Sequence, residues 1–261
     1  MTKNETIFSK APDMKYHEEI QQTDVGEFEK VVKNRRSVRL FTADPVPKAV
    51  IENALDWALL APNSSNLQCF ELLWIQNTEA KNQLKKFCFG QPAAKSAPEL
   101  IVVVAKPYLW KKHAKQMLHV FQEQESKGVE VPKSAKDYYG KLAPMVYRQG
   151  PLGILGLVKK IAFFFVGLKK IVPREPTSHG EMRIWANKSA ALACQNFMMG
   201  LSAQGFDSCP MEGFDSKRVK KLLKLSRCDD IVMVISCGKR SPGGVYGPRL
   251  RFPKEQFIKI I

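Results

Sequence analysis

The feature that most constrains the fold is the seven-residue stretch Glu99–Ala105. After its first residue it reads Leu-Ile-Val-Val-Val-Ala and contains no polar side chain. A continuous, largely β-branched run of this kind is typical of a strand that is buried on both faces. Two further stretches, Phe70–Ile75 and Asp230–Ser236, are similarly apolar and predict strands. The chain is therefore expected to build a sheet whose middle is covered on both sides.

Helices are predicted in the segments around these strands. Ile51, Ala54, Leu55 and Ala58 recur at the spacing of one helix face. The long segment 180–204 is rich in small residues, which would allow close packing against another helix. Because helices and strands mix without strict βαβ alternation, the fold class is α+β. The expected helices span residues 26–36, 47–60, 78–87, 110–124, 180–204 and 216–225.

Length and composition fit one domain with a sizeable core, since the chain has 261 residues and is 44% hydrophobic. The polar residues 1–25 are expected to form an N-terminal extension ahead of a domain at 26–261. No C-x-x-C pair occurs among the six cysteines, and the four histidines lack metal-ligand spacing. This pattern predicts free thiols in a reducing cytoplasm and no metal. No signal-peptide core or apolar run long enough to span a membrane is found.

The first motif with chemical potential is Arg35-Arg36-Ser37-Val38-Arg39, which places three guanidiniums and a hydroxyl within five residues. It falls where a predicted helix ends and an extended segment begins, so the directions of these side chains would be fixed by the backbone. Arginine offers a fixed fork of donors that matches phosphate oxygens. A solvated surface or basic patch is the alternative. The formal charge of +16 favours anionic partners without choosing among nucleotides, nucleic acid and membranes.

Three further motifs complete the pattern. Residues 62–68, Pro-Asn-Ser-Ser-Asn-Leu-Gln, offer hydroxyls and amides suited to a polar ring edge, although a plain helix-ending turn would have the same composition. Residues 210–215 read Pro-Met-Glu-Gly-Phe-Asp, and the glycine would let the backbone approach a ligand closely. Arg249 and Arg251 are two residues apart, so in an extended segment both can reach one anion.

Together these segments resemble the nitroreductase family of flavin mononucleotide (FMN) enzymes over most of the chain. The resemblance implies a mixed β-sheet flanked by helices, in an intertwined homodimer with two flavins at the interface. C-terminal residues 257–261 would reach across to the other subunit. It also implies an FMN-dependent oxidoreductase that takes electrons from NADH or NADPH and reduces nitroaromatic or quinone acceptors in a ping-pong cycle. No residue beyond the flavin is expected to be catalytic.

The resemblance further implies roles for individual residues. The Arg-Ser motif and the later arginine pair would hold the FMN phosphate, and Arg39 would stabilise charge at the pyrimidine edge. The 62–68 loop would contact the flavin, in many members from the partner subunit. The Gly213 N–H would approach flavin N5. The expected cofactor-binding residues are Arg35, Arg36, Ser37, Arg39, Asn63, Ser64, Ser65, Asn66, Gln68, Gln91, Met211, Glu212, Gly213, Arg249 and Arg251.

Three positions differ in how closely they match the family. Glu212 would orient substrate or nicotinamide, or it would only be an acidic residue favoured near the N-terminus of the following helix. Cys69 stands where the family usually has a proline, so the entry to the strand after the loop is expected to be less rigid. Gln91 occupies roughly the position of a family amide.

Residues 106–180 are expected to be an insertion containing a basic, amphipathic, apolar segment at 151–173. At helical spacing its large apolar side chains gather on one face, and most of its lysines fall on the other half. This is the pattern of a helix lying at a membrane interface. A lid over the active site, or an element packed on the partner subunit, is the alternative.

Other functions remain open on the sequence alone. One is a specialised flavin reductase or dehalogenase on the same fold, because a fold does not fix a substrate. Another is a non-catalytic basic protein that binds membrane or nucleic acid. This alternative does not explain why the flavin motifs are present, so no nucleic-acid partner is expected. The expected location is the cytoplasm, with or without peripheral contact at the inner face of a membrane.

Overall fold

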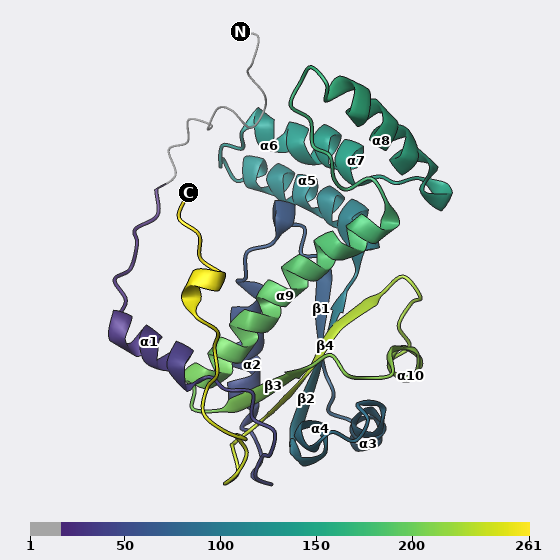
Figure 1. Ribbon diagram of the computed structural model, residues 1–261. Coiled ribbons are helices and arrows are strands. Elements are labelled where there is room, and N and C mark those ends of the chain that lie inside the picture. The colour runs from purple at the N-terminus through teal and green to yellow at the C-terminus, as the bar shows by residue number, and fades with distance from the viewer. Residues whose placement is uncertain (1–16) are drawn as a thin grey trace.

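The computed structural model describes residues 17–261, so residues 1–16 of the predicted N-terminal extension lie outside the described residues. Its centre is a four-stranded antiparallel sheet of order β1-β2-β4-β3 (Figure 1). The strands are β1 (Phe70–Trp74), β2 (Glu99–Ala105), β3 (Asp207–Met211) and β4 (Asp230–Gly238). The three strands predicted from apolar runs are β1, β2 and β4, and the α+β class is confirmed.

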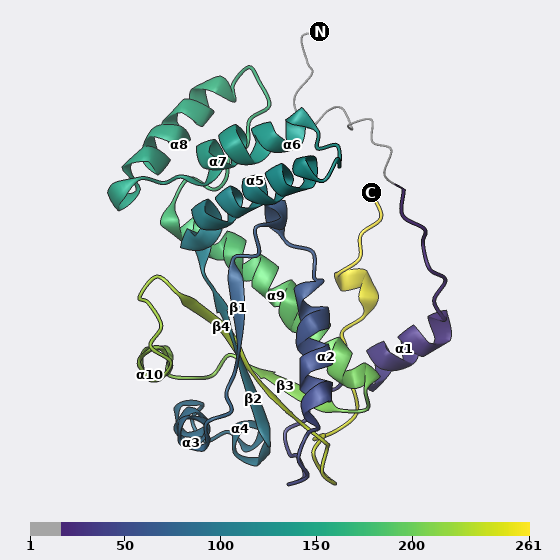
Figure 2. The ribbon, with the colours of Figure 1, turned by 180° about the vertical axis from the view of Figure 1, so that it is seen from behind.

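Helices cover the sheet and one of its ends (Figures 1 and 2). The predicted positions are close to those observed, except that α10 ends early because Leu223 leaves the helix and Lys224 has a φ of 53°. The helices are α1 (Val25–Asn34), α2 (Lys48–Leu59), α3 (Thr78–Phe87), α4 (Pro92–Ser96), α5 (Trp110–Ser126), α6 (Lys133–Asp137), α7 (Ala143–Tyr147), α8 (Ile154–Val166), α9 (His179–Ala203) and α10 (Ser216–Leu222).

The central strand β2 divides the core into two layers. It pairs with β1 on one side and β4 on the other, and its residues from Leu100 to Ala105 have no exposed surface. Ile101 and Val103 join a cluster with α2 and α9, whereas Leu100 and Val102 join one with α3, α4 and α10. Alternation along the strand therefore explains why an uninterrupted apolar run is needed.

The edge strand β3 was not predicted as a strand. It contains Pro210, which cannot donate a ladder hydrogen bond and is tolerated at a sheet edge. Parallel pairing within residues 17–261 occurs only as the isolated bridge between Ser37 and Ser208. The parallel part of the expected mixed sheet is thus limited, in the described chain, to this bridge, which brings the arginine motif beside β3.

The close packing expected of the small-residue helix is present between α9 and α2. A Cβ added at Gly200 would lie 2.7 Å from Trp57 Cε3 and 3.3 Å from Ala54 Cα. Such distances leave no room for a side chain, so this glycine sets the separation of the two helices.

Residues 106–180 form a helical layer, α5 to α8, across one end of the sheet, with α8 at its outer edge (Figures 1 and 2). Among residues 17–261 no single helix is both long and apolar enough to cross a membrane. The segments 133–147 and 151–166 meet that criterion only when taken together, and they are bent by 71° relative to each other.

Candidate functional site

Four guanidiniums gather where α1 ends. Arg249 donates hydrogen bonds to the carbonyl oxygens of Lys33 and Arg35, each at 2.7 Å, and Arg36 donates to Gly247 O at 2.6 Å. The C-terminal segment therefore runs beside the end of α1, as Figure 1 shows. The sequence separates these residues by more than 200 positions, and the fold brings them together.

The electrostatics of this cluster fit an anion. Burial lowers the pKa of the Arg35 guanidinium, and the charges of Arg249 and Arg251 lower it further. Arg36 adds a smaller effect of the same sign. Like charges held together disfavour one another, and an anion placed among them would relieve the repulsion. The cluster is therefore a candidate phosphate site.

Arg39 extends the cluster along β3. Its guanidinium lies 5.2 Å from the centroid of the Tyr246 ring and donates to Ser37 O at 3.2 Å. Burial raises the pKa of the Cys209 thiol, an effect that the nearby charges of Arg39 and Arg35 oppose. Tyr246 was not singled out from the sequence, since a lone aromatic gives no signal until it is seen against an arginine.

Gly213 and Gln91 meet at the other end of β3. Gln91 Nε2 donates to Gly213 O at 2.7 Å and to Cys88 O at 3.1 Å. A Cβ added at Gly213 would lie 3.1 Å from Gln91 Nε2, so the glycine lets the amide approach the peptide closely. Within residues 17–261 no acceptor is bonded to the Gly213 N–H. The arrangement holds this glycine with its donor free for a ligand.

The two residues before Gly213 differ in their accessibility. The Met211 side chain is buried in the core, so only its backbone can meet a ligand. Glu212 is exposed at an open groove of about 660 Å³ that Asn187 and Arg183 of α9 also line. The N-cap of α10 is Asp215, whose carboxylate accepts from Arg218 N at 3.0 Å, so Glu212 has no capping role.

The 62–68 loop is anchored by the helical layer. Three of its residues, Ser65, Asn66 and Gln68, have positive φ of 47–58°. The Ser65 hydroxyl bonds to the hydroxyls of Tyr138 and Tyr147 at 2.5 and 2.6 Å. These contacts offset strain that an isolated loop would release. Ser65 therefore holds the loop, while Ser64, Asn66 and Gln68 are exposed and face outward.

Further hydrogen bonds complete the anchoring of this loop. Tyr139 donates to Ser65 O at 2.8 Å, and the Asn63 side chain accepts from Gln68 N at 2.8 Å. His113 Nδ1 lies 2.6 Å from Leu67 O. The tyrosines and His113 were not predicted from the sequence, because the partners are far apart along the chain.

One subunit does not bring the whole predicted set together. The arginine motif precedes α2 and the 62–68 loop follows it, so the length of this helix separates them. Twelve helical residues span about 18 Å. The arginine cluster and Gly213 share β3, whereas the loop lies at the opposite end of the molecule beside α5 (Figure 1).

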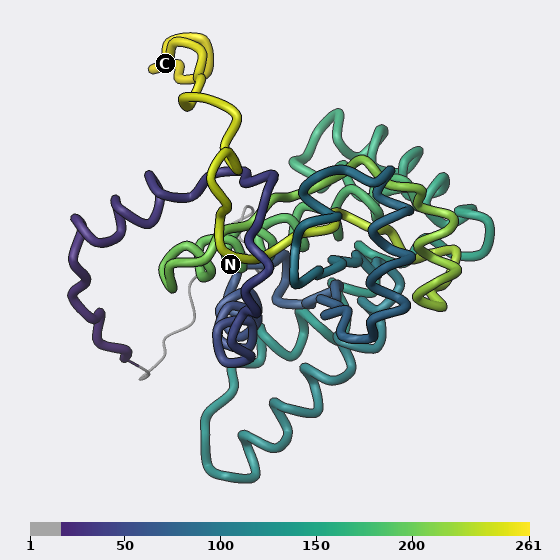
Figure 3. Tube along the Cα trace, turned by 90° about the horizontal axis from the view of Figure 1, so that it is seen from below, coloured from purple at the N-terminus to yellow at the C-terminus, as the bar shows by residue number. Residues whose placement is uncertain are grey.

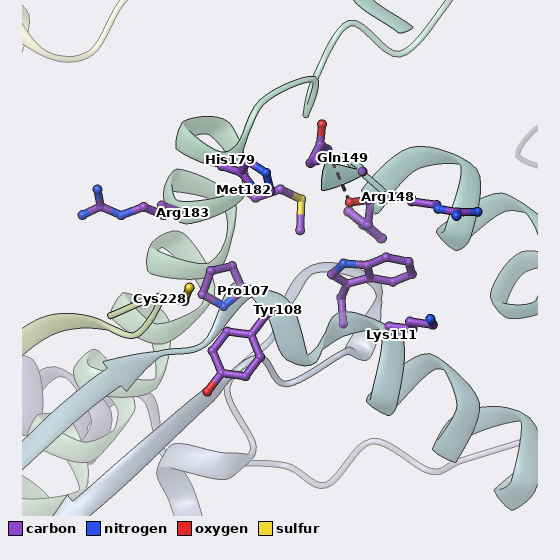
Figure 4. Close-up of a pocket in the computed structure, with 12 residues that line it drawn as sticks. Pro107, Tyr108, Lys111, Arg148, Gln149, His179, Met182, Arg183 and Cys228 are labelled. Atoms are coloured by element: carbon purple, nitrogen blue, oxygen red, sulfur yellow. Dashed lines mark hydrogen bonds between the residues drawn. The ribbon is translucent and has the colours of Figure 1, made fainter. Parts of the chain in front are cut away.

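A separate cavity of about 480 Å³ lies at the base of the helical layer (Figure 4). Tyr108, Trp110 and Tyr147 supply much of its apolar wall, and His179 and Arg183 come from the start of α9. None of the predicted cofactor-binding residues lines it.

Comparison with known proteins identifies the relatives of this arrangement. A sequence model described as the nitroreductase family matches residues 32–239. The chain belongs to the nitroreductase family. A Bacillus subtilis protein named as an NAD(P)H nitroreductase, MhqN, is 25% identical over 238 residues, covering 91% of this chain and 100% of that protein. An NADH dehydrogenase of Thermus thermophilus is 24% identical, covering 86% and 91%.

Solved structures agree with this membership at the level of the fold. A nitroreductase-type protein from Exiguobacterium sibiricum in complex with FMN superposes with a TM-score of 0.64 at 22% identity. The match covers 93% of this chain and 99% of that one. The expected family and oxidoreductase class are confirmed, as are FMN and NAD(P)H as the cofactors of the family.

Proposed function

We propose that this nitroreductase-family chain works as a homodimer, with each FMN held between two subunits. The arginine cluster and Gly213 of one subunit would face the 62–68 loop of the other. The observation that carries this proposal is the division of the predicted donor set by α2, which leaves each half incomplete within one chain.

Exposed apolar surface supports the dimer. Helix α1 has no buried residue, and its Val25 and Phe28 side chains are largely exposed. The C-terminal Ile260 and Ile261 are fully exposed, and α1 and the C-terminal segment extend away from the body (Figure 3). Such surface is costly in water and is typical of an interface that a second subunit covers.

The residues present fit FMN. Burial lowers the pKa of Arg35 most and the neighbouring arginine charges lower it further, and a phosphate dianion would relieve this repulsion. When bound, FMN would supply the redox chemistry, receiving a hydride at N5 from NADH or NADPH and passing electrons to the acceptor. The Gly213 N–H would donate to N5, and Gln91 would keep that peptide in place. Arg39 would stabilise negative charge at the pyrimidine edge.

The acceptors we propose are nitroaromatics or quinones, reduced in a ping-pong cycle in which donor and acceptor use the same open face. The groove beside Glu212 is open rather than enclosed and carries both charge signs, with Arg183 and Asp230 among its lining residues. A broad site of this kind admits flat acceptors of different size.

The visible spectrum of the purified protein tests the core of this proposal. An oxidised-flavin spectrum should bleach under anaerobic NADH or NADPH and return when a quinone or nitroaromatic is added. A colourless protein that cannot be reconstituted with FMN would refute it. A flavin that neither nucleotide bleaches would refute NADH and NADPH as the electron donors.

Mixed dimers test the shared site directly. Arg35→Ala/Arg249→Ala damages one half of the predicted donor set, and Asn66→Ala/Gln68→Ala damages the other. Each double variant should bind FMN at least tenfold more weakly. Dimers containing one copy of each should regain one intact site and about half of the wild-type flavin content. Mixed dimers that remain as empty as the parents would show that both halves act within one subunit.

A further inference from the structure

The outer helix α8 presents an unbroken apolar stripe to solvent. Its large side chains recur three and four residues apart, which is the spacing of one helix face. Each of them is 52–68% exposed. The stripe consists of Ile154, Leu157, Val158, Ile161, Phe164 and Phe165 of α8, together with Leu168 just beyond its end. We call it the α8 stripe.

The opposite side of α8 holds the helix to the body through polar groups. Lys159 Nζ donates to Val146 O at 2.6 Å and to Pro176 O at 3.3 Å. A Cβ added at Gly156 would lie 2.1 Å from Thr177 O, so the helix backbone lies against that chain segment. The usual arrangement of a surface helix is reversed, because Lys159 points inward whereas Phe164 and Phe165 point outward.

The segment that carries the stripe is positively charged throughout. Residues 138–174 contain no aspartate or glutamate. Lys160, Lys169, Lys170 and Arg174 are exposed around the stripe. A second copy of α8 placed face to face would bring these charges against their own copies. An anionic surface would instead satisfy both the apolar stripe and the charges that surround it.

We propose that α8 docks the protein on an anionic lipid bilayer, with the α8 stripe buried among the acyl chains and the flanking lysines at the headgroups. The helix would lie in the plane of the interface, because its thirteen residues span only about 20 Å and its inner face is bonded to the protein. The proposal depends on no cofactor and stands apart from the proposed redox function.

Vesicle flotation of the full-length protein tests it. Wild type should float with phosphatidylcholine vesicles containing phosphatidylglycerol, far less with phosphatidylcholine alone, and less again at high salt. Leu157→Gln/Ile161→Gln/Phe165→Gln should lower binding at least tenfold. Lys160→Gln/Lys169→Gln/Lys170→Gln should weaken binding to anionic vesicles strongly, by about fivefold per lysine. Val120→Gln/Val129→Gln, which changes exposed apolar residues of the same layer outside α8, should float like wild type.

Additional measurements separate lipid docking from misfolding and from self-association. Thermal unfolding and NAD(P)H oxidation with a soluble acceptor should be unchanged in the α8 variants, which shows that they are folded. Wild type already has four tryptophans, so its emission is subtracted from that of Phe164→Trp. The difference spectrum should shift to the blue with anionic vesicles and be quenched by brominated lipid. If wild type does not float, or the triple apolar variant floats equally well, the proposal is overturned. If that variant instead dissociates a larger assembly, the stripe is covered by a second copy and the proposal is also overturned.

Discussion

The tyrosine anchors of the 62–68 loop give the sharpest prediction. Tyr147→Phe removes one hydroxyl and leaves the ring, so its packing 4.6 Å from the Trp185 ring centroid is kept. The hydroxyl removed is one that bonds to Ser65, and a bond of this kind contributes about 1 kcal/mol. Ser65 holds a φ of 58°, a conformation that costs on the order of 1–2 kcal/mol for a residue other than glycine. The free energy that this hydrogen bond contributes is therefore similar to the free energy that the Ser65 backbone conformation costs.

Loss of this hydrogen bond should weaken FMN binding as well as lower the stability of the protein. If the relaxed loop must be reordered when FMN binds, about 1 kcal/mol raises the FMN dissociation constant roughly fivefold. Tyr138→Phe should behave in the same way, because its hydroxyl shares the same Ser65 oxygen. The double variant should lose more than the sum of the two, because in either single variant the Ser65 hydroxyl can still bond to the remaining tyrosine hydroxyl.

Urea unfolding at fixed protein concentration and FMN fluorescence titration measure the two effects. Tyr108→Phe is the matched control, because it removes a hydroxyl bonded to Asp229 at 2.8 Å, away from the loop. It should lower the free energy of unfolding by about 1–3 kcal/mol and leave FMN affinity unchanged. The reasoning is refuted if Tyr147→Phe alters FMN affinity no more than Tyr108→Phe does.

Three further outcomes follow from single contacts. Arg249→Ala should weaken FMN binding at least tenfold in calorimetry, and added inorganic phosphate should inhibit binding less in the variant than in wild type. Gly213→Ala should slow anaerobic flavin reduction about tenfold in stopped flow while FMN affinity changes little, because the new Cβ would lie 3.1 Å from Gln91 Nε2 and would push back the amide that is bonded to this peptide. Gly200→Ala should lower the free energy of unfolding by about 1–3 kcal/mol in urea titration, because its Cβ would meet Trp57 at 2.7 Å. If the FMN affinity of Arg249→Ala, the flavin reduction rate of Gly213→Ala or the unfolding free energy of Gly200→Ala equals that of wild type, the role given to that residue is wrong.

Periodicity predicted most of the fold because most elements bury a regular face. The β2 run and the α2 pattern are of this kind, and both are where the sequence placed them. β3 was not predicted because it contains Pro210, which a strand tolerates only at positions such as the sheet edge. Which strand lies at the edge depends on the tertiary structure and cannot be read from the local sequence. The candidate site divides in the same way. Short motifs indicated Arg35 and Gly213, but the bond between Gln91 and Gly213 joins residues 122 positions apart.

The helical layer shows most clearly what a sequence pattern leaves open. The spacing in segment 151–173 predicted an apolar face and an opposite basic side, but a pattern of that kind cannot say which side meets the protein. The structure decides this through Gly156 and Lys159, which hold the helix by its polar side. The same layer directs Tyr138 and Tyr147 inward to the 62–68 loop. Its two faces are therefore separable, and changes to the α8 stripe should alter lipid binding without altering the loop that the tyrosines hold.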